Sequence, residues 1–463
     1  MTTYARRIGL FSGTLLVVGG IIGSGVFLNP SVVAQRVGTG PYTMLAWGLG
    51  AVIATLGAFI FAELGARAPS AGGGYAYLRD AFGPLPAFLY GWALLLAIAS
   101  GATAAVAVTF ANYAVPLLGL GAGSERPLAI SAIGVFTVIN IVGVAPGAVV
   151  QNVFTLLKLG AIAMLIVVGL FVTGAPEPVA SAAVASATLS ASLAVPLAAP
   201  LAVPHGFMAV AVALGTALVP VLFAYGGWQQ TNFVAEEMID PRRDLPRALI
   251  IGVLIVAAAY LLANLTYLES LGVEGLASSR APAADVMGLK FGDAGRRLIA
   301  VGIAISTAGF LNLVILVTPR VYQAMARDGV FFRALATLHP RTRTPVAAIA
   351  LQCAWSVGLV LSGTYGDLLD WVTFADWIFF GLTAATLFVY RRREASGPYF
   401  LAPFHPWSTG LFMLASAYVV LGAIVSNPLN AVRGTLVLAA GVPVYLWWRR
   451  TQAGRGTDGP SGA

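Results

Sequence analysis

Long hydrophobic runs dominate the chain, and short polar stretches separate them. Twelve of the runs are long enough to cross a bilayer as helices, since about 20 apolar residues span its hydrocarbon core. The runs cover residues 10–35, 42–66, 84–114, 128–145, 148–172, 207–237, 247–269, 296–325, 344–362, 367–390, 408–425 and 433–448. The pattern predicts an all-α polytopic membrane protein with twelve transmembrane helices.

Glycines interrupt the middle of the first run. Residues 19–25 read GGIIGSG, and glycine weakens a helix where a membrane span should be most regular. Backbone groups freed inside a membrane are tolerated where protein buries them or where they line a cavity. Such a break presents N–H groups on one side and carbonyls on the other, which suits a ligand carrying both a carboxylate and an ammonium. Close packing of another helix against the glycines is the alternative interpretation.

The sixth run contains a second glycine break. Residues 223–228 read FAYGGW, five spans after the first break. An odd number of spans between two copies makes the repeat an inverted one. Two interrupted helices at matching places in inverted halves are typical of secondary transporters that bind substrate at the bilayer midplane.

Composition and charge agree with a membrane protein. The chain is 59% hydrophobic and 10% charged, far less charged than a soluble domain. Its net charge of +8 is explained by basic residues concentrated in one set of loops, so no nucleic acid partner is expected. The positive-inside rule then places both termini in the cytoplasm, with the chain in the plasma or inner membrane. The single cysteine, Cys353, excludes an internal disulfide framework.

Three segments lie outside the predicted spans. Residues 174–206 are rich in alanine, serine, valine and proline and are interpreted as a low-complexity outer loop. Residues 271–293 form a second long outer loop, for which short helices are expected. The glycine-rich, polar residues 451–463 predict a disordered cytoplasmic tail.

Four motifs carry a resemblance to a known family. They are GIIGSGVF at 20–27, PSAGGGYAYL at 69–78, FAYGGW at 223–228 and ARDG at 326–329. Together they resemble the amino acid–polyamine–organocation superfamily, in particular the L-type amino acid transporter branch and its bacterial relatives. The resemblance implies a LeuT-like core of two inverted five-helix repeats over residues 1–393, with two peripheral helices over 394–450.

The resemblance also implies a substrate site at the two breaks. The substrate carboxylate would lie on the N–H groups of residues 23–25, and the ammonium on carbonyls near Ile21, Phe223 and Ala224. Phe223 would cover the substrate as an aromatic gate, and Gly226 would leave room for its side chain. The candidate substrate-binding residues are Ile21, Ile22, Gly23, Ser24, Gly25, Phe223, Ala224, Gly226 and Asp376.

Two ionisable residues inside predicted spans are functional candidates, since such groups are costly in a membrane. Relatives that resemble this chain project a lysine at the position of Lys158 toward the first and eighth helices. There its ammonium could replace a sodium ion or carry a proton. Snorkelling to the cytoplasmic face is the alternative. Asp376 could assist proton coupling or favour a cationic substrate, or it could simply pack against water at the helix surface.

Three glutamates lie at predicted cytoplasmic helix ends: Glu63, Glu236 and Glu237, the last two beside Arg242 and Arg243. They are interpreted as inner-gate ion pairs or solvated helix ends. The outer loop at 115–127 lacks the cysteine through which L-type transporters join a heavy chain. A disulfide-linked heavy chain is therefore not expected.

The combined prediction is a secondary active transporter that moves neutral L-amino acids by alternating access. Lysine in place of sodium predicts a sodium-independent exchanger or proton symporter. Cationic amino acids, polyamines or organic cations are the alternative substrates, and a non-transporting amino acid sensor is a further alternative. The sequence lacks HExxH, a nucleophile–base pair and a metal cluster, so neither an enzyme nor a cofactor is expected. The expected partners are the amino acid and membrane lipid.

Overall fold

A computed structural model describes residues 3–121, 123–172, 204–363, 365–394, 397–426 and 428–455. Most of the predicted outer loop at 174–206 and the last residues of the predicted tail lie outside this description. Within it, helix α17 (Pro428–Arg455) continues through the first residues of the predicted tail. The regular secondary structure of the described residues is helical, apart from one isolated β-bridge between Ile8 and Met238.

The first, third, sixth and eighth predicted spans are each built from more than one helical piece; the eighth contains the end of α12 (Pro282–Val317) and most of α13 (Pro319–Arg327). The first consists of α1 (Leu10–Ile21) and α2 (Gly25–Val37), which meet at 43°. The third consists of α5 (Pro84–Ala93), a π-helical turn η1 (Leu94–Ile98) and α6 (Ala99–Leu117). The sixth consists of α10 (Phe207–Ala224) and the 3₁₀ helix η4 (Trp228–Glu237).

The other helices follow the remaining hydrophobic runs and their connections. They are α3 (Gly40–Arg67), α4 (Gly74–Phe82), α7 (Glu125–Val142), α8 (Val144–Phe171), α11 (Pro241–Ser278), α12 (Pro282–Val317), α13 (Pro319–Arg327), η5 (Arg333–Ala336), α14 (Val346–Ser362), α15 (Tyr365–Arg393) and α16 (Trp407–Ser426).

Helix therefore occupies each predicted run. Among the described residues, nine helical stretches are long and apolar enough to cross a membrane, or ten when α1 and α2 count as one span. This supports a multi-pass membrane protein. The count of twelve spans and the inverted repeat remain predictions.

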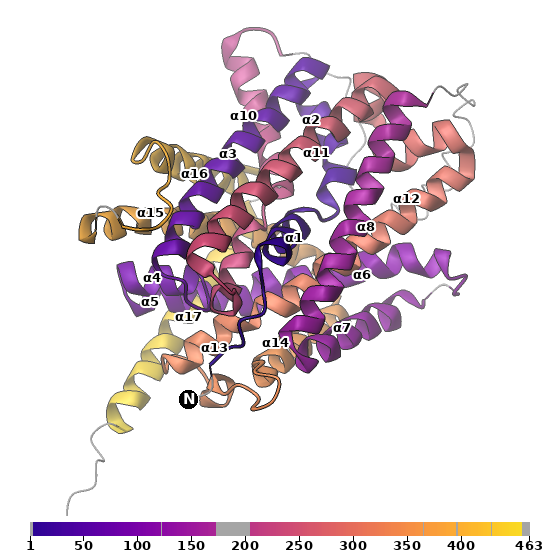
Figure 1. Ribbon diagram of the computed structural model, residues 1–463. Helices are drawn as coiled ribbons and strands as arrows, with labels where there is room; N and C mark the ends of the chain where they lie inside the picture. The colour runs from indigo at the N-terminus through magenta and orange to yellow at the C-terminus, as the bar shows by residue number, and fades with distance from the viewer. Residues whose placement is uncertain are drawn as a thin grey trace, which may run out of the picture.

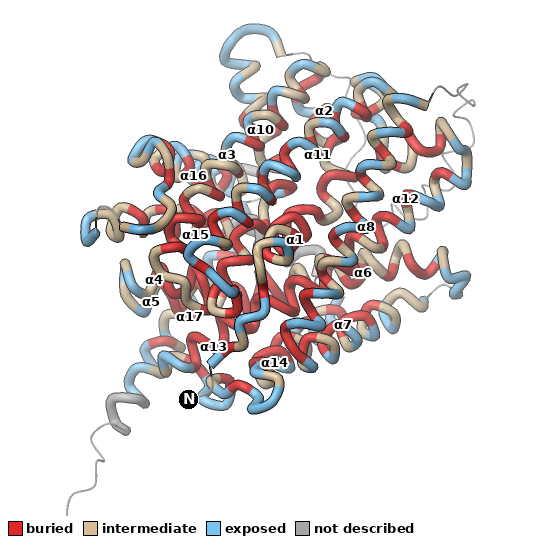
Figure 2. The backbone as a smooth tube through the Cα atoms, viewed as in Figure 1, coloured by how far each residue is buried: buried red, intermediate tan, exposed pale blue. Residues whose placement is uncertain are grey.

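The broken first span lies at the centre of the molecule. Helix α1 is surrounded by α8, α11, α12 and η4, all of which it contacts. Figure 2 shows buried residues concentrated around this centre and exposed ones along the outer helices. The two ends of the described chain lie on the same side of the molecule (Figure 1), as an even number of spans requires.

The second predicted outer loop is helical, as expected. Helix α11 continues past a kink at Gly272, and α12 begins before a kink at Gly292. These glycines have φ angles of +66° and +56°, which a residue with a side chain adopts only at a cost. The loop at 271–293 thus consists of two short helical pieces joined by a turn.

Ion pairs gather at the end predicted to be cytoplasmic, as expected from the three glutamates. Glu63 is fully buried and pairs with Arg67 at 2.7 Å and with Arg391 of α15 at 2.6 Å. It also accepts the N–H of Ala402 at 2.6 Å. The result ties α3 to α15 and to the segment that enters α16.

The other two glutamates pair with distant arginines and not with Arg242 and Arg243 beside them. Glu237 pairs with Arg320 at 2.6 Å, with both side chains buried, and Glu236 pairs with Arg327 at 3.4 Å. Sequence neighbours cannot reveal such partners, because the folding of α12 and α13 against η4 brings them together.

Candidate functional site

The two glycine breaks are in direct contact. Gly227 has a φ angle of +108°, and a Cβ on this residue would lie 2.1 Å from the carbonyl oxygen of Gly20. A Cβ on Gly20 would in turn lie 2.8 Å from the carbonyl oxygen of Gly227. Only glycine permits this approach. The alternative interpretation, that these glycines allow close packing, is therefore correct. The segment that packs against the first break is the second break.

Tyr260 of α11 links the two breaks from behind. Its hydroxyl lies 3.1 Å from the carbonyl oxygen of Ile21 and 3.2 Å from that of Ala224. A hydroxyl carries one hydrogen, so it donates to one of these carbonyls at a time. Both carbonyls also have a second lone pair, which leaves acceptor capacity at the ends of α1 and α10.

Lys158 of α8 closes the other side of the first break. The side chain is fully buried, and its Nζ donates to the carbonyls of Gly19 at 3.1 Å and Ile22 at 2.8 Å. Ser306 of α12 donates to the carbonyl of Gly23 at 3.2 Å. The predicted approach of Lys158 to the first and eighth spans is confirmed, and the snorkelling alternative is wrong.

These contacts provide hydrogen-bond donors for carbonyls that the end of α1 leaves without helical partners. The N–H groups on the opposite side of the break, by contrast, remain without acceptors in the described part of the chain. Within the described residues, the N–H groups of Gly23, Ser24 and Gly25 have no hydrogen-bond acceptor, and the Ser24 hydroxyl makes no capping bond. They stand at the first turn of α2, where the helix dipole attracts an anion.

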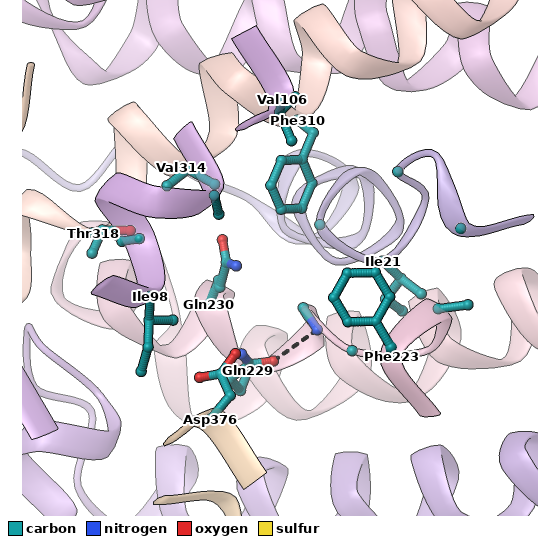
Figure 3. Close-up of a pocket in the computed structure, with 18 of the residues that line it drawn as sticks. Ile21, Ile98, Val106, Phe223, Gln229, Gln230, Phe310, Val314, Thr318 and Asp376 are labelled. Carbon is teal, nitrogen blue, oxygen red and sulfur yellow. Dashed lines mark hydrogen bonds between the residues drawn. The ribbon is translucent and has the colours of Figure 1, made fainter. Parts of the chain in front are cut away.

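One cavity runs along both breaks (Figure 3). Its walls come from α1, α2, η1, α6, α10, η4, α12, the junction of α12 and α13, and α15. The lining residues are Gly20, Ile21, Gly23, Ser24, Gly25, Leu94, Ile98, Ala99, Ala102, Val106, Leu222, Phe223, Ala224, Gly226, Gly227, Gln229, Gln230, Phe233, Phe310, Val314, Thr318, Asp376, Trp377 and Phe380.

The cavity brings together all but one of the predicted substrate-binding residues. The exception is Ile22, which does not line it and whose carbonyl is bonded to Lys158. Phe223 lines it and is 43% exposed, so its ring is not packed into the surrounding core. Figure 3 shows this ring beside Ile21. What each residue does there remains a prediction.

Several residues of the site were not predicted from the sequence. Gln229, Gln230 and Phe310 line the cavity, while Tyr260 and Ser306 bind the broken backbone from outside it. The two glutamines follow a glycine break within a hydrophobic run, a polar pair that could have been noticed. The tyrosine and the serine gave no comparable signal, because single hydroxyl side chains are common in membrane helices.

The second motif positions η4, which carries the two glutamines. Tyr77 of α4 donates to the side-chain oxygen of Asn232 at 3.1 Å, and Tyr75 donates to Asp328 at 2.9 Å. Burial, followed by the Asp328 carboxylate, raises the pKa of Tyr75, so this tyrosine keeps its proton and acts as a donor. Helix α4 thereby fixes η4 and the end of α13 against each other.

Within the described part of the chain, no three histidine, cysteine or acidic side chains gather as a metal site would require. The polar groups that line the cavity include backbone dipoles and the side chains of Ser24, Gln229, Gln230, Thr318 and Asp376.

Comparison with known proteins identifies the family of the chain. A family model described as amino acid permease matches residues 8–447. The human b(0,+)-type amino acid transporter 1 is 33% identical over 438 residues, which is 92% of this chain and 84% of the relative. The mouse large neutral amino acids transporter small subunit 2 is 30% identical over 456 residues, covering 96% and 82%. These relatives are transporters and not enzymes. The chain belongs to the amino acid permease family.

Proposed function

We propose that this protein is a secondary active transporter of L-amino acids, neutral ones included, that binds their α-carboxylate and α-ammonium at the two helix breaks. One observation carries the proposal: two broken helices cross at a single cavity, with unpaired N–H groups on one side and carbonyls on the other. The carboxylate lies on Gly23, Ser24 and Gly25. The ammonium lies on the carbonyls of Ile21 and Ala224.

The cavity walls support neutral side chains. Away from the breaks, most of the lining is apolar, including Ile98, Val106, Phe310 and Val314. Burial of such side chains favours binding by about 25 cal/mol for each Å² removed from water. The ring of Phe223, a residue of α10 that lies beside Ile21 of the first break, closes over the bound substrate.

Sodium independence is proposed from Lys158. Its ammonium lies between α8 and the carbonyls of the first break, so a fixed cation already occupies this position. Transport then proceeds as exchange or as proton symport. The protein resides in the cell membrane with both termini cytoplasmic, and the ion pairs of Glu63, Glu236 and Glu237 close the inner side until the substrate-bound helices move.

The test is uptake of labelled L-leucine into liposomes that contain the purified protein. Uptake is measured with and without internal leucine, in sodium or choline buffer, and across an imposed pH gradient. We expect saturable uptake that is equal in sodium and choline. A requirement for internal leucine indicates exchange, and stimulation by an inward proton gradient indicates symport. Absence of uptake and of binding for every amino acid, with a correctly folded protein, would contradict the proposal.

Lys158→Ala identifies the role of the lysine in the same assay, with Lys290→Ala of the outer loop as the matched control. Loss of the ammonium leaves the buried carbonyl of Gly19 unpaired and that of Ile22 with only a 3.4 Å contact to the Ser306 hydroxyl. An unpaired buried carbonyl costs roughly 1–3 kcal/mol. We expect leucine uptake to fall at least about 10-fold, while the control transports normally. Restored uptake of Lys158→Ala on addition of sodium would show that the ammonium replaces the ion.

A further inference from the structure

A second hollow lies away from the helix breaks, between the outer parts of three helices. Its lining residues come from α2, α10 and α16 and are Arg36, Thr216, Val219, Tyr418 and Gly422. Helix α10 contacts both of the others. In Figure 1, α2 and α10 extend away from the end of the molecule at which the N-terminus lies. The hollow therefore belongs to the side that the charge distribution predicts to be outside.

Arg36 brings a positive charge to this hollow. Its guanidinium donates to the carbonyl of Thr216, and a guanidinium has five N–H groups, so donor capacity remains. None of the ion pairs found among the described residues includes Arg36, and none of the lining residues is acidic. The hollow thus presents a cation without a counter-charge from its own walls, which favours an anionic ligand.

Tyr418 lies at the same point. Its hydroxyl and the guanidinium of Arg36 are close enough to interact electrostatically. A phenol hydroxyl donates one hydrogen bond, and an arginine binds the two oxygens of a phosphate with parallel N–H groups. The two side chains together therefore suit a single phosphate group placed between α2 and α16.

The depth of Arg36 suits a lipid headgroup. Helix α2 rises about 1.5 Å per residue, which puts Arg36 up to about 16 Å along the helix from Gly25 at the first break. The hydrocarbon core extends about 15 Å on each side of the bilayer midplane. With the break at the midplane, as predicted, the guanidinium lies near the boundary where the phosphates of the outer leaflet begin.

The hollow also continues two stripes of side chains that are at least partly exposed. Residues three or four apart lie on one face of a helix, and in a membrane an exposed apolar face contacts lipid tails. The hollow therefore opens toward acyl chains, which a free phosphate lacks. The stripes are Met208, Val212, Thr216 and Val219 on α10 and Leu414, Tyr418 and Leu421 on α16.

We propose that this hollow binds an anionic phospholipid of the outer leaflet, with its phosphate on Arg36 and Tyr418 and its acyl chains along α10 and α16. The bound lipid connects α2 and α10, the outer halves of the two broken spans, to the peripheral helix α16. The inference goes beyond the proposed function and does not depend on it, because lipid binding can be measured without transport.

The experiment counts lipids bound to the purified full-length protein by native mass spectrometry. Protein freed of copurified lipid is titrated with dioleoylphosphatidylglycerol, which carries one negative charge, or with dioleoylphosphatidylcholine, which carries no net charge. The acyl chains of the two probes are the same. We expect this site to bind phosphatidylglycerol more tightly, on the order of 10-fold, because only that headgroup leaves its phosphate charge uncompensated.

Two variants isolate the site from other basic residues that attract the same lipid. Arg36→Gln removes the charge and keeps a donor for the Thr216 carbonyl, and we expect it to lose one tightly bound phosphatidylglycerol relative to the wild type. Gly422→Leu keeps Arg36 but fills the hollow, since a Cβ there already lies 3.3 Å from Val219. It should lose the same lipid, and it carries the test if Arg36→Gln does not fold. Arg280→Gln, the same change at an exposed outer arginine, is the control.

The outcomes separate a lipid site from its alternatives. Equal phosphatidylglycerol binding by the wild type and both variants would overturn the inference. Equal affinity of the site for phosphatidylcholine would also overturn it, since the charge would then not be recognised. Displacement of the lipid by glycerol 3-phosphate, a headgroup without acyl chains, would instead show a site for a soluble anion. Leucine binding to the same wild-type protein tests the proposed function separately, and its absence would leave the lipid site intact.

Discussion

Gly227 and Gly20 show at the scale of single residues how the site depends on missing side chains. Each lies within van der Waals distance of the other's carbonyl, so the two breaks are in direct contact. Tyr260 then needs only one hydroxyl to contact both broken helices. Backbone groups, held by a few side chains from behind, make up most of the candidate site.

Gly227→Ala should damage both stability and binding. Its Cβ would meet the Gly20 carbonyl at 2.1 Å, at a φ angle of +108°. Positive φ and overpacking each cost about 1–3 kcal/mol, so we expect a loss of at least about 2 kcal/mol and of leucine binding. The melting temperature in detergent and leucine binding are the measurements. Gly48→Ala in α3, where a Cβ meets nothing within 4 Å, should be neutral or stabilising. Wild-type behaviour of Gly227→Ala would mean that the breaks do not need this contact.

At the scale of elements, a buried ion pair connects the ends of helices that are far apart in the sequence. Arg320 pairs with Glu237 and also donates to the carbonyl of Leu316, so η4 is held to the junction of α12 and α13. The N–H groups of Arg7 and Ile8 both donate to the carbonyl of Glu237, at 2.8 and 3.0 Å. The segment before α1 therefore joins the same contact.

Glu237→Leu and Arg320→Met should each destabilise the protein more than the double variant does. Removal of one partner leaves the other charge buried and unpaired, at a cost of about 3–5 kcal/mol, whereas an apolar pair can be nearly neutral. Melting temperatures of the three variants form the double-mutant cycle. The exposed pair of Asp293 and Arg296 is the control, and Asp293→Asn should change the melting temperature very little. Additive effects of the two core variants would show that their charges do not interact.

At the scale of the whole molecule, the proposal is that the chain works without a disulfide-linked partner. The outer loop at 115–127 contains no cysteine, and the single cysteine, Cys353, lies in α14. It is partly buried and packs with the apolar residues of α6, α7, α8 and α12. One of the relatives is named a small subunit, so whether this chain has a disulfide-linked partner is a question to test.

Cys353→Ser should therefore leave leucine uptake within about 2-fold of the wild type, because the change removes one weakly polar atom from a partly buried site. Wild-type protein extracted from its membrane should migrate at the same mass on reducing and non-reducing gels. A larger species that disappears on reduction, and is absent for Cys353→Ser, would show a disulfide-linked partner.

The sequence by itself determined the helices and the location of the breaks. Hydrophobic length fixes where helices form in a membrane, and the glycines at 19–25 and 226–227 weaken them locally whatever the surroundings. The free N–H groups of Gly23–Gly25 and the depth of Lys158 within its span follow from the same local reasoning. The resemblance to the family then predicted that the substrate binds at these positions.

Only the tertiary structure decided which groups meet. Three sets of contacts depend on helix rotation and packing. Tyr260 and Ser306 bind the broken backbone, Arg320 pairs with Glu237, and Gln230 lines the same cavity as Asp376. A hydrophobic run gives the position of a helix along the chain but not its angle about its own axis. Side chains from distant helices therefore cannot be paired from the sequence, and only the folded structure shows that Gln229 and Gln230 line the same cavity as Asp376.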